Sequence, residues 1–379
     1  MKFIHFGCWN EGYCNTINTN INGLSATMNL LRETVKEASE KNIPYDFISV
    51  AGDNYYATEL EKPKIHKVFD KINFNSGFNC LPKDIMKIVI LGNHEIEKNV
   101  EFDGSVVNCG SLMKQVELSQ TDPTIKLFND MMCIYRDNTL ILFIDTTIYT
   151  MKDQKISDTC YKTLDINGNT TYKVFKKSTI DENESINKLA DYMNNRILDA
   201  IVNISLEKGS DFKNLILIGH EPIYGMKTKI DKLGNKNNKV SSIMKFISFF
   251  NTNIIPILNE DNIKTYYLCA DTHIYQKGII IFDNMTYIVE QHVVGTGGAH
   301  QDMPSEILQE GKDKTNNMLE YNIVEQSDKF GFVTVNIVNG IINIIYNSVT
   351  TPILKGGDKE KSYYYKYIKY KQKYNNMKL

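Results

Sequence analysis

Short apolar runs recur along the chain, and each ends in a polar cluster, which in four of the six cases follows a glycine. The six runs are KFIHFG before Cys8, DFISVAG before Asp53, KIVILG before Asn93, LILFID at Asp145, NLILIG before His220 and TYYLCA before Asp271. Runs with apolar residues at consecutive positions are typical of strands buried on both faces, so helices must cover the sheet that they form. The pattern therefore predicts an α/β fold.

Two longer segments have apolar residues at helical spacing and supply the expected cover. Residues 22–42 and 185–204 each place apolar side chains on one stripe, which we interpret as a face that packs on the core. The stripes consist of Leu24, Met28, Leu31 and Val35 in the first segment and Ile186, Leu189, Met193, Ile197 and Ile201 in the second. Near the end of the chain, Asn339-Gly340 lies between two β-rich runs and predicts a hairpin.

Composition is that of a globular protein, because 379 residues with 42% hydrophobic content can bury a large core. Three stretches rich in Asn and Lys, 151–185, 226–241 and 301–329, are expected to be surface insertions rather than linkers. A strand-like run begins near the first residue, and no apolar segment is long enough to cross a bilayer. We therefore expect neither a signal peptide nor a membrane anchor.

The cysteines and the net charge indicate the redox compartment and the kinds of partner to expect. The seven cysteines have no paired spacing, which favours reduced thiols in a cytosol-like compartment. The formal net charge of −2 gives no general attraction to nucleic acid or to an anionic membrane. We therefore expect neither of them as a partner.

The polar clusters that follow the apolar runs are the candidate functional residues. In layered α/β folds, ligands bind where loops converge at the carboxyl ends of the strands. Together the clusters would gather Asp53, Tyr56, Asn93, His94, His220, Asp271 and His273. So many carboxylate, imidazole and amide groups are costly to desolvate unless a divalent metal compensates them, and an Asp flanked by His and Asn suits a two-metal hydrolytic centre. Each fragment alone also fits a turn with a hydrogen-bonded histidine.

The order and setting of four motifs add a family resemblance. GDNYY, GNHE, GHEPIYG and CADTHIYQ each end an apolar run, and in this order they resemble the calcineurin-like metallophosphoesterases. Within that superfamily they are most similar to the small, tartrate-resistant purple acid phosphatases, and the resemblance covers roughly residues 2–350. It implies a four-layer α/β/β/α sandwich formed by a domain of residues 1–352.

The resemblance also implies roles for individual residues. Asp53 would bridge two metal ions. Tyr56 and His273 would bind the first ion, and Asn93 and His220 the second. His94 would lie outside the ligand shell, where it would bond a substrate oxygen and assist the leaving group.

Two positions depart from the family pattern. Cys8 stands where an aspartate is expected, and Asp271 stands where a histidine is expected. A thiolate at Cys8 would favour zinc or another soft ion, whereas a carboxylate at Asp271 would suit manganese or magnesium. Alternatively, Cys8 is a small buried hydrophobic residue, and the first site keeps three ligands.

These roles imply metal-dependent hydrolysis of a phosphoester, with two ions drawn from zinc, manganese or iron. The substrate would be a phosphorylated small molecule or a phosphoprotein, handled by a phosphomonoesterase-like enzyme. The main alternative is an inactive scaffold or binding protein that keeps the fold, since each metal has lost one customary ligand. A nuclease is a third alternative, but no basic face with interleaved aromatic residues precedes the C-terminus.

Residues 353–379 form a tail that is rich in Tyr and Lys. The segment YYYKYIKYKQKY at 363–374 has its tyrosines at helical spacing, so either an amphipathic docking helix or a basic, partly disordered tail is expected. The segment resembles the tails of many proteins of giant DNA viruses of the mimivirus kind. That resemblance implies an assembly signal with a virion partner, and a location in the host cytoplasm or in the virion.

Overall fold

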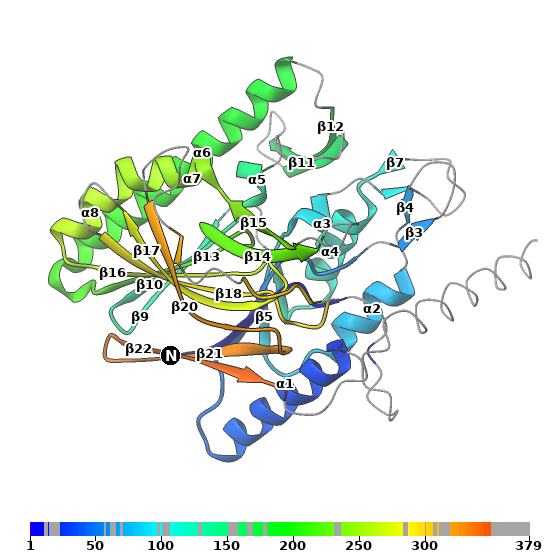
Figure 1. Cartoon of the computed structure of the whole chain (residues 1–379), viewed down its shortest axis with the longest axis horizontal. Helices are drawn as coiled ribbons and strands as arrows, with labels where there is room; N and C mark the ends of the chain where they lie inside the picture. Colours follow the sequence, from blue (N-terminus) through cyan, green and yellow to red (C-terminus); the bar gives the residue numbers. More distant parts are fainter. Residues whose placement is uncertain are drawn as a thin grey trace, which may run out of the picture.

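The structure is a computed structural model of the whole chain (Figure 1). It describes residues 1–10, 14, 23–56, 58–60, 66–68, 71–96, 99–100, 107–127, 131–150, 158–164, 170–176, 180–230, 236–282, 287–299, 301–305, 309–310 and 319–349. The tail from residue 353 onwards lies outside the described residues. Residues 306–308 and 311–318 also lie outside them.

Two mixed sheets form the centre of the molecule. The first consists, in spatial order, of β22 (Ile341–Ser348), β21 (Gly331–Val338), β1 (Lys2–Phe6), β2 (Phe47–Ala51), β5 (Met86–Ile90) and β8 (Ile125–Leu127). The second consists of β19 (Gln309–Glu310), β20 (Leu319–Ser327), β17 (Tyr275–Phe282), β18 (Tyr287–Val294), β16 (Lys264–Cys269), β13 (Asn214–Ile218), β10 (Thr139–Ile144) and β9 (Met131–Arg136).

Helices accompany both sheets. They are α1 (Gly23–Glu40), α2 (Lys71–Cys80), α3 (Asn93–Ile96), α4 (Gly110–Thr121), α5 (Thr147–Thr150), α6 (Ile180–Lys208), η1 (Gly209–Asp211), α7 (Met244–Phe249), η2 (Phe250–Ile254) and α8 (Ile255–Glu260). Smaller sheets are β11 (Asp158–Leu164) with β12 (Thr170–Lys176), β14 (Tyr224–Ile230) with β15 (Lys236–Ser242), and the set β3 (Thr58–Leu60), β4 (His66–Val68), β6 (Asn99–Val100) and β7 (Val107–Asn108).

Side chains that alternate along β10 show how the sheets and helices are stacked. Leu140 and Leu142 belong to a core that includes Ile197 of α6 and Phe246 of α7. Phe143, on the other face of the same strand, belongs to a core shared with the first sheet and with α1. The second sheet is therefore buried on both faces, as its continuous apolar runs predicted, and Figure 1 shows α6, α7 and α8 along its outer side.

The parallel strands place their carboxyl ends together. In the first sheet, β1 pairs with β2 and β2 with β5 in parallel, while β21 runs antiparallel to β1. In the second sheet, β10, β13 and β16 are parallel neighbours, and β17 runs antiparallel to β18. Each sheet is thus mixed, and its central strands end at one edge.

The helix and hairpin predictions are confirmed. The expected helices at 22–42 and 185–204 are α1 and α6, which is longer than expected at its N-terminal end. Asn339 and Gly340 connect β21 to β22 with φ angles of 51° and 75°. Two successive residues with positive φ are typical of a two-residue hairpin turn.

Two expectations were wrong. Within 301–329, which we expected to be a surface insertion, β20 is a strand of the second sheet, because Leu319, Tyr321 and Ile323 alternate inward and are buried. The cysteines are not all reduced, since Cys14 and Cys80 form a disulfide across 66 residues of sequence and Cys109 is also disulfide-bonded. Folding brings the Cys14 and Cys80 Cα atoms to 6.3 Å, which sequence spacing could not indicate.

Among the helices of the described residues, none is both long and apolar enough to cross a membrane.

Candidate metal centre

Sharp bends after the parallel strands turn the polar clusters towards one another. Cys8 follows β1, Asp53 follows β2 and Asp271 follows β16, and all three have positive φ angles, of 51°, 50° and 54°. Such angles are uncommon outside glycine and recur at functional sites. Gly52 allows the loops to meet, because a Cβ there would lie 2.5 Å from Nδ1 of His220.

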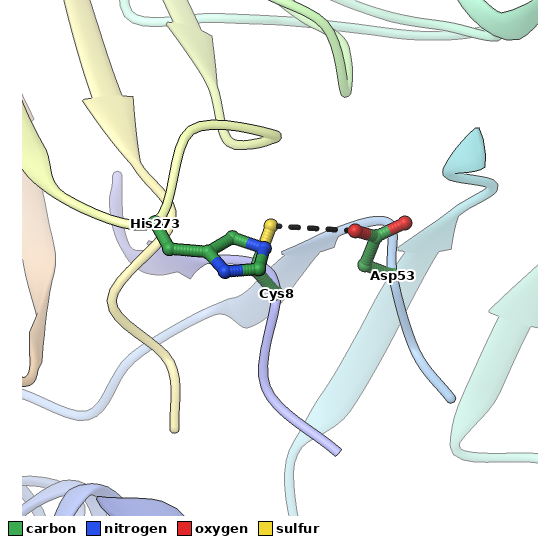
Figure 2. Close-up of side chains that lie close together, drawn as sticks. All are labelled: Cys8, Asp53 and His273. Carbon is green, nitrogen blue, oxygen red and sulfur yellow. Dashed lines mark hydrogen bonds between the residues drawn. The ribbon is translucent and has the colours of Figure 1, made fainter. Parts of the chain in front are cut away.

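Four side chains form the first group of candidate ligands: Cys8, Asp53, Tyr56 and His273. The Cys8 sulfur lies 3.7 Å from Asp53 Oδ2, and Figure 2 shows the two facing each other beside the His273 ring. Ligand atoms of Cys8, Asp53 and His273 all lie within 4.8 Å of one another. The Tyr56 hydroxyl donates to Asp53 Oδ2 at 3.0 Å and lies 3.0 Å from His273 Nε2.

Asp53 also faces a second group, which contains Asn93 and His220. His220 Nε2 lies 3.3 Å from Asp53 Oδ1 and 3.0 Å from Asn93 Oδ1. Nδ1 of the same ring donates to the Ala51 carbonyl at 2.7 Å. That bond fixes the ring and leaves Nε2 as the nitrogen directed at a ligand, which is how metal-binding histidines are commonly held.

Both groups fit metal ions, by the chemistry of their donors. The first offers sulfur, carboxylate, phenol and imidazole, and the second offers carboxylate, amide oxygen and imidazole. These are ordinary ligands of zinc and of first-row transition metals. The bridging position expected for Asp53 is supported by its two oxygens, one of which faces each group.

Asp271 lies differently from the other expected ligands. Its Oδ2 accepts a hydrogen bond from Ser241 Oγ of β15 at 2.9 Å. Within the described residues it does not join the group of Cys8, Asp53 and His273. Its role as a metal ligand stays a prediction.

His94 lies at the rim of the centre, on the short helix α3. Its side chain is 24% exposed, and its Nε2 lies 3.9 Å from Asp53 Oδ2. Its ring packs against the Tyr56 ring at a centroid distance of 4.5 Å, and its backbone N–H donates to Asp53 Oδ1 at 3.2 Å. The imidazole thus lies beside Asp53 and Tyr56 of the first group and is still partly open to solvent.

Glu95 is a structural residue that the sequence argument passed over. Its carboxylate is fully buried and accepts bonds from the backbone N–H groups of Asn54 at 2.9 Å, Tyr55 at 3.2 Å and Gly92 at 2.7 Å. It therefore ties the loop after β2 to the loop after β5. Its place directly after His94 was the only available signal.

Asp302 and Lys227 are a second pair that no motif indicated. The Asp302 carboxylate accepts a bond from the backbone N–H of His273 at 3.1 Å and forms an ion pair with Lys227 of β14. Both side chains are largely buried. The pair holds the loop that carries His273 from outside the candidate ligand shell.

Burial and mutual charge determine the protonation of the centre without metal. Burial alone would raise the pKa of Asp53, but the imidazoles of His220, His94 and His273 hold it at about 2. Burial alone would lower the pKa of His220, but Asp53 and Glu221 raise it to about 9. Burial, with Asp53 and Asp271 nearby, holds the pKa of Cys8 well above its usual value. Metal ions must therefore displace protons when they bind.

A comparison with known protein families identifies the class of protein to which this fold and donor set belong. The chain matches the calcineurin-like phosphoesterases over residues 1–275, and it is a member of that family. Membership implies a hydrolase that acts on phosphoesters with the help of metal ions, of which the family typically binds two. No curated protein matches the chain at a significant level.

Proposed function

We propose that the protein is a phosphomonoesterase-like hydrolase with an altered two-metal centre, similar to the small purple acid phosphatases. The observation that carries the proposal is the Asp53 carboxylate, whose two oxygens face two separate sets of metal donors beside the partly exposed His94. We also propose the four-layer α/β/β/α arrangement for the domain of residues 1–352. The two cores on either face of β10 support it.

Cys8, Tyr56 and His273 would hold the first ion, and Asn93 and His220 the second, with Asp53 between them. The chemistry supplied by ions held by these residues would be polarisation of a phosphoryl oxygen and a lower pKa of bound water. Glu95 and Asp302 keep the loops in place through backbone hydrogen bonds, so the donors need little rearrangement.

His94 would handle the leaving group. Its imidazole is near Asp53 Oδ2 and partly open to solvent, so a protonated Nε2 can donate its proton to the ester oxygen as the P–O bond breaks. The substrate would be a phosphorylated small molecule or a phosphoprotein, with no role for nucleic acid or membrane.

The test is hydrolysis of p-nitrophenyl phosphate by the purified full chain after incubation with zinc, manganese or iron. Asp53→Asn should abolish turnover, and His94→Ala should lower kcat about 10²- to 10⁴-fold, the usual contribution of a general acid. Asp199→Asn, the same change on the exposed side of α6, is the matched control. Equal hydrolysis rates for the unchanged protein and Asp53→Asn would exclude the proposed phosphoesterase activity.

A second candidate is a scaffold or binding protein that has lost turnover. The observation that favours it is the bond between Asp271 and Ser241, which directs this carboxylate to β15. A protein that binds metal but hydrolyses no simple phosphoester above the Asp53→Asn background would support the scaffold.

The tail at 353–379 would supply a partner in assembly. We propose that it directs the protein to a virion or virus factory in the host cytoplasm, by its resemblance to the tails of giant-virus proteins. Deletion of residues 358–379 should leave folding and metal binding unchanged and alter where the protein accumulates. Unaltered accumulation of the truncated chain would remove this part of the proposal.

A further inference from the structure

The two sets of donors around Asp53 are unequal. The first set has four members, and Cys8 and Asp53 are almost completely buried. Apart from the shared Asp53, the second set consists, among the described residues, of Asn93 and His220, which are both neutral when they act as ligands. Asp271 is the carboxylate that could strengthen this set: it lies near His220 and Cys8, but its Oδ2 already accepts a hydrogen bond from Ser241. Charge and donor number therefore both favour the first position.

The Cys8 sulfur faces the Asp53 carboxylate, although the residue also packs among small apolar side chains, Ala51, Ala270 and Ala299. The Cys8 N–H donates to the Gly52 carbonyl at 3.1 Å, and the Cys8 carbonyl accepts from the Ala299 N–H at 3.0 Å. These bonds fix the residue at a φ angle of 51°, which a non-glycine residue rarely adopts. The residue is thus held with its sulfur 3.7 Å from Asp53 Oδ2.

The spacing of the first set matches that of a sulfur-containing zinc site. Ligand distances of about 2.3 Å for sulfur and about 2.0 Å for oxygen place two tetrahedral ligand atoms about 3.5 Å apart. The Cys8 sulfur and Asp53 Oδ2 are 3.7 Å apart. Little movement is needed for both to contact one ion.

We propose that Cys8, Asp53, Tyr56 and His273 form a thiolate-containing site that binds one zinc-like ion tightly, while the Asn93–His220 side binds a second ion much more weakly. This inference rests on the proposed metal centre and adds its metal preference and its stoichiometry. On binding, the Cys8 thiol releases its proton to solvent and the sulfur becomes a ligand. A thiolate ligand favours zinc and other soft or borderline ions over manganese and magnesium.

Cobalt(II) is the probe, because it replaces zinc in such sites and gives a thiolate-to-metal charge-transfer band in the near ultraviolet when sulfur is a ligand. The metal-stripped full chain is titrated with cobalt(II) while its absorption is recorded. We expect the band to saturate at one equivalent of cobalt and to disappear in Cys8→Ser. Manganese at the same concentration should compete poorly, and zinc should displace the cobalt.

Cys133→Ser is the matched control, because Cys133 is also a reduced cysteine but is exposed on β9. The band should be unchanged in this variant. Cys8→Asp, which has the aspartate expected for the family, should bind metal without the band and should gain affinity for manganese. If Cys8→Ser does not fold, Cys8→Asp and the titration of the unchanged protein still show whether the Cys8 sulfur is a metal ligand.

Saturation at two equivalents with equal affinity, the absence of the band, or a band that persists in Cys8→Ser would overturn the inference. The readout is independent of turnover. Hydrolysis without the band would therefore refute the thiolate site alone, and the band without hydrolysis would refute the proposed activity alone.

Discussion

Glu95 shows at the scale of single residues how the loops of the centre are held. Its two carboxylate oxygens accept three buried backbone N–H groups, from Asn54, Tyr55 and Gly92. A glutamine there keeps one acceptor oxygen and presents an NH₂ group to at least one of these donors. A buried donor without an acceptor costs about 1–3 kcal/mol.

We therefore expect Glu95→Gln to lower the free energy of unfolding by about 1–3 kcal/mol and to weaken metal binding, because the loops that carry Asp53 and Asn93 would separate. Chemical denaturation and a metal titration measure the two effects. Glu33→Gln on the exposed surface of α1 is the control. An unchanged denaturation midpoint in Glu95→Gln would contradict the role of the residue.

The protonation of the metal-free centre predicts a dependence of stability on pH. The pKa of His220 is raised from 6.5 to about 9, so its contribution is fully present below pH 6.5 and is lost as the pH rises through 9.

Thermal unfolding of the metal-stripped protein should therefore occur at lower temperature as the pH increases from 6.5 to 9. His220→Gln should make this slope shallower, since it removes the group with the raised pKa. A melting temperature that rises over this interval would contradict the assignment.

At the scale of elements, the site depends on segments that lie far from its motifs. Asp302 lies after β18 and supports His273 through a backbone bond, and Lys227 of β14 neutralises it. Residues that support metal ligands from outside the shell commonly affect metal affinity by about 10- to 100-fold. We expect Asp302→Asn to weaken zinc binding about tenfold while the protein stays folded.

A competition assay with a zinc indicator, with circular dichroism of the same samples, measures this effect. Asp199→Asn should bind zinc as the unchanged protein does. Equal affinity in Asp302→Asn would show that the loop after β16 holds His273 without this support.

The central strands, two long helices and one hairpin could be predicted because each leaves a continuous pattern in the sequence. Leu24 to Val35 recur at helical spacing, and Asn339-Gly340 is a strong local turn signal. The convergence of Asp53, Asn93 and His220 could be predicted because parallel strands end at one edge. The pairing of Asp271 with Ser241 and of Asp302 with His273 could not be predicted, since each joins separate segments through the folded shape alone.

At the scale of the whole molecule, the disulfide fixes the loop after β1 to α2. Cys14 and Cys80 close a loop across 66 residues, which carries α1 and β2 of the first sheet. A crosslink of this length stabilises a fold by about 2–4 kcal/mol, largely by restricting the unfolded chain. The bond differs from the reduced thiols expected from cysteine spacing, and of the locations proposed above the virion is the one in which disulfides persist.

The double variant Cys14→Ser with Cys80→Ser should therefore lower the free energy of unfolding by about 2–4 kcal/mol. Dithiothreitol should lower that of the unchanged protein by at least as much, because it also reduces the disulfide of Cys109. Denaturation curves with and without reductant check this. Cys133→Ser, which removes a reduced thiol, is the control. A double variant as stable as the unchanged protein would contradict the stabilising role.

The account as a whole depends on metal binding at the loops where the two sheets meet. The most direct measurement is the metal content of the purified full chain by elemental mass spectrometry, after incubation with zinc and removal of the excess. We predict about one tightly bound zinc ion per chain in the unchanged protein and almost none in Asp53→Asn. A protein that retains no zinc, or an Asp53→Asn variant that retains as much as the unchanged protein, would contradict it.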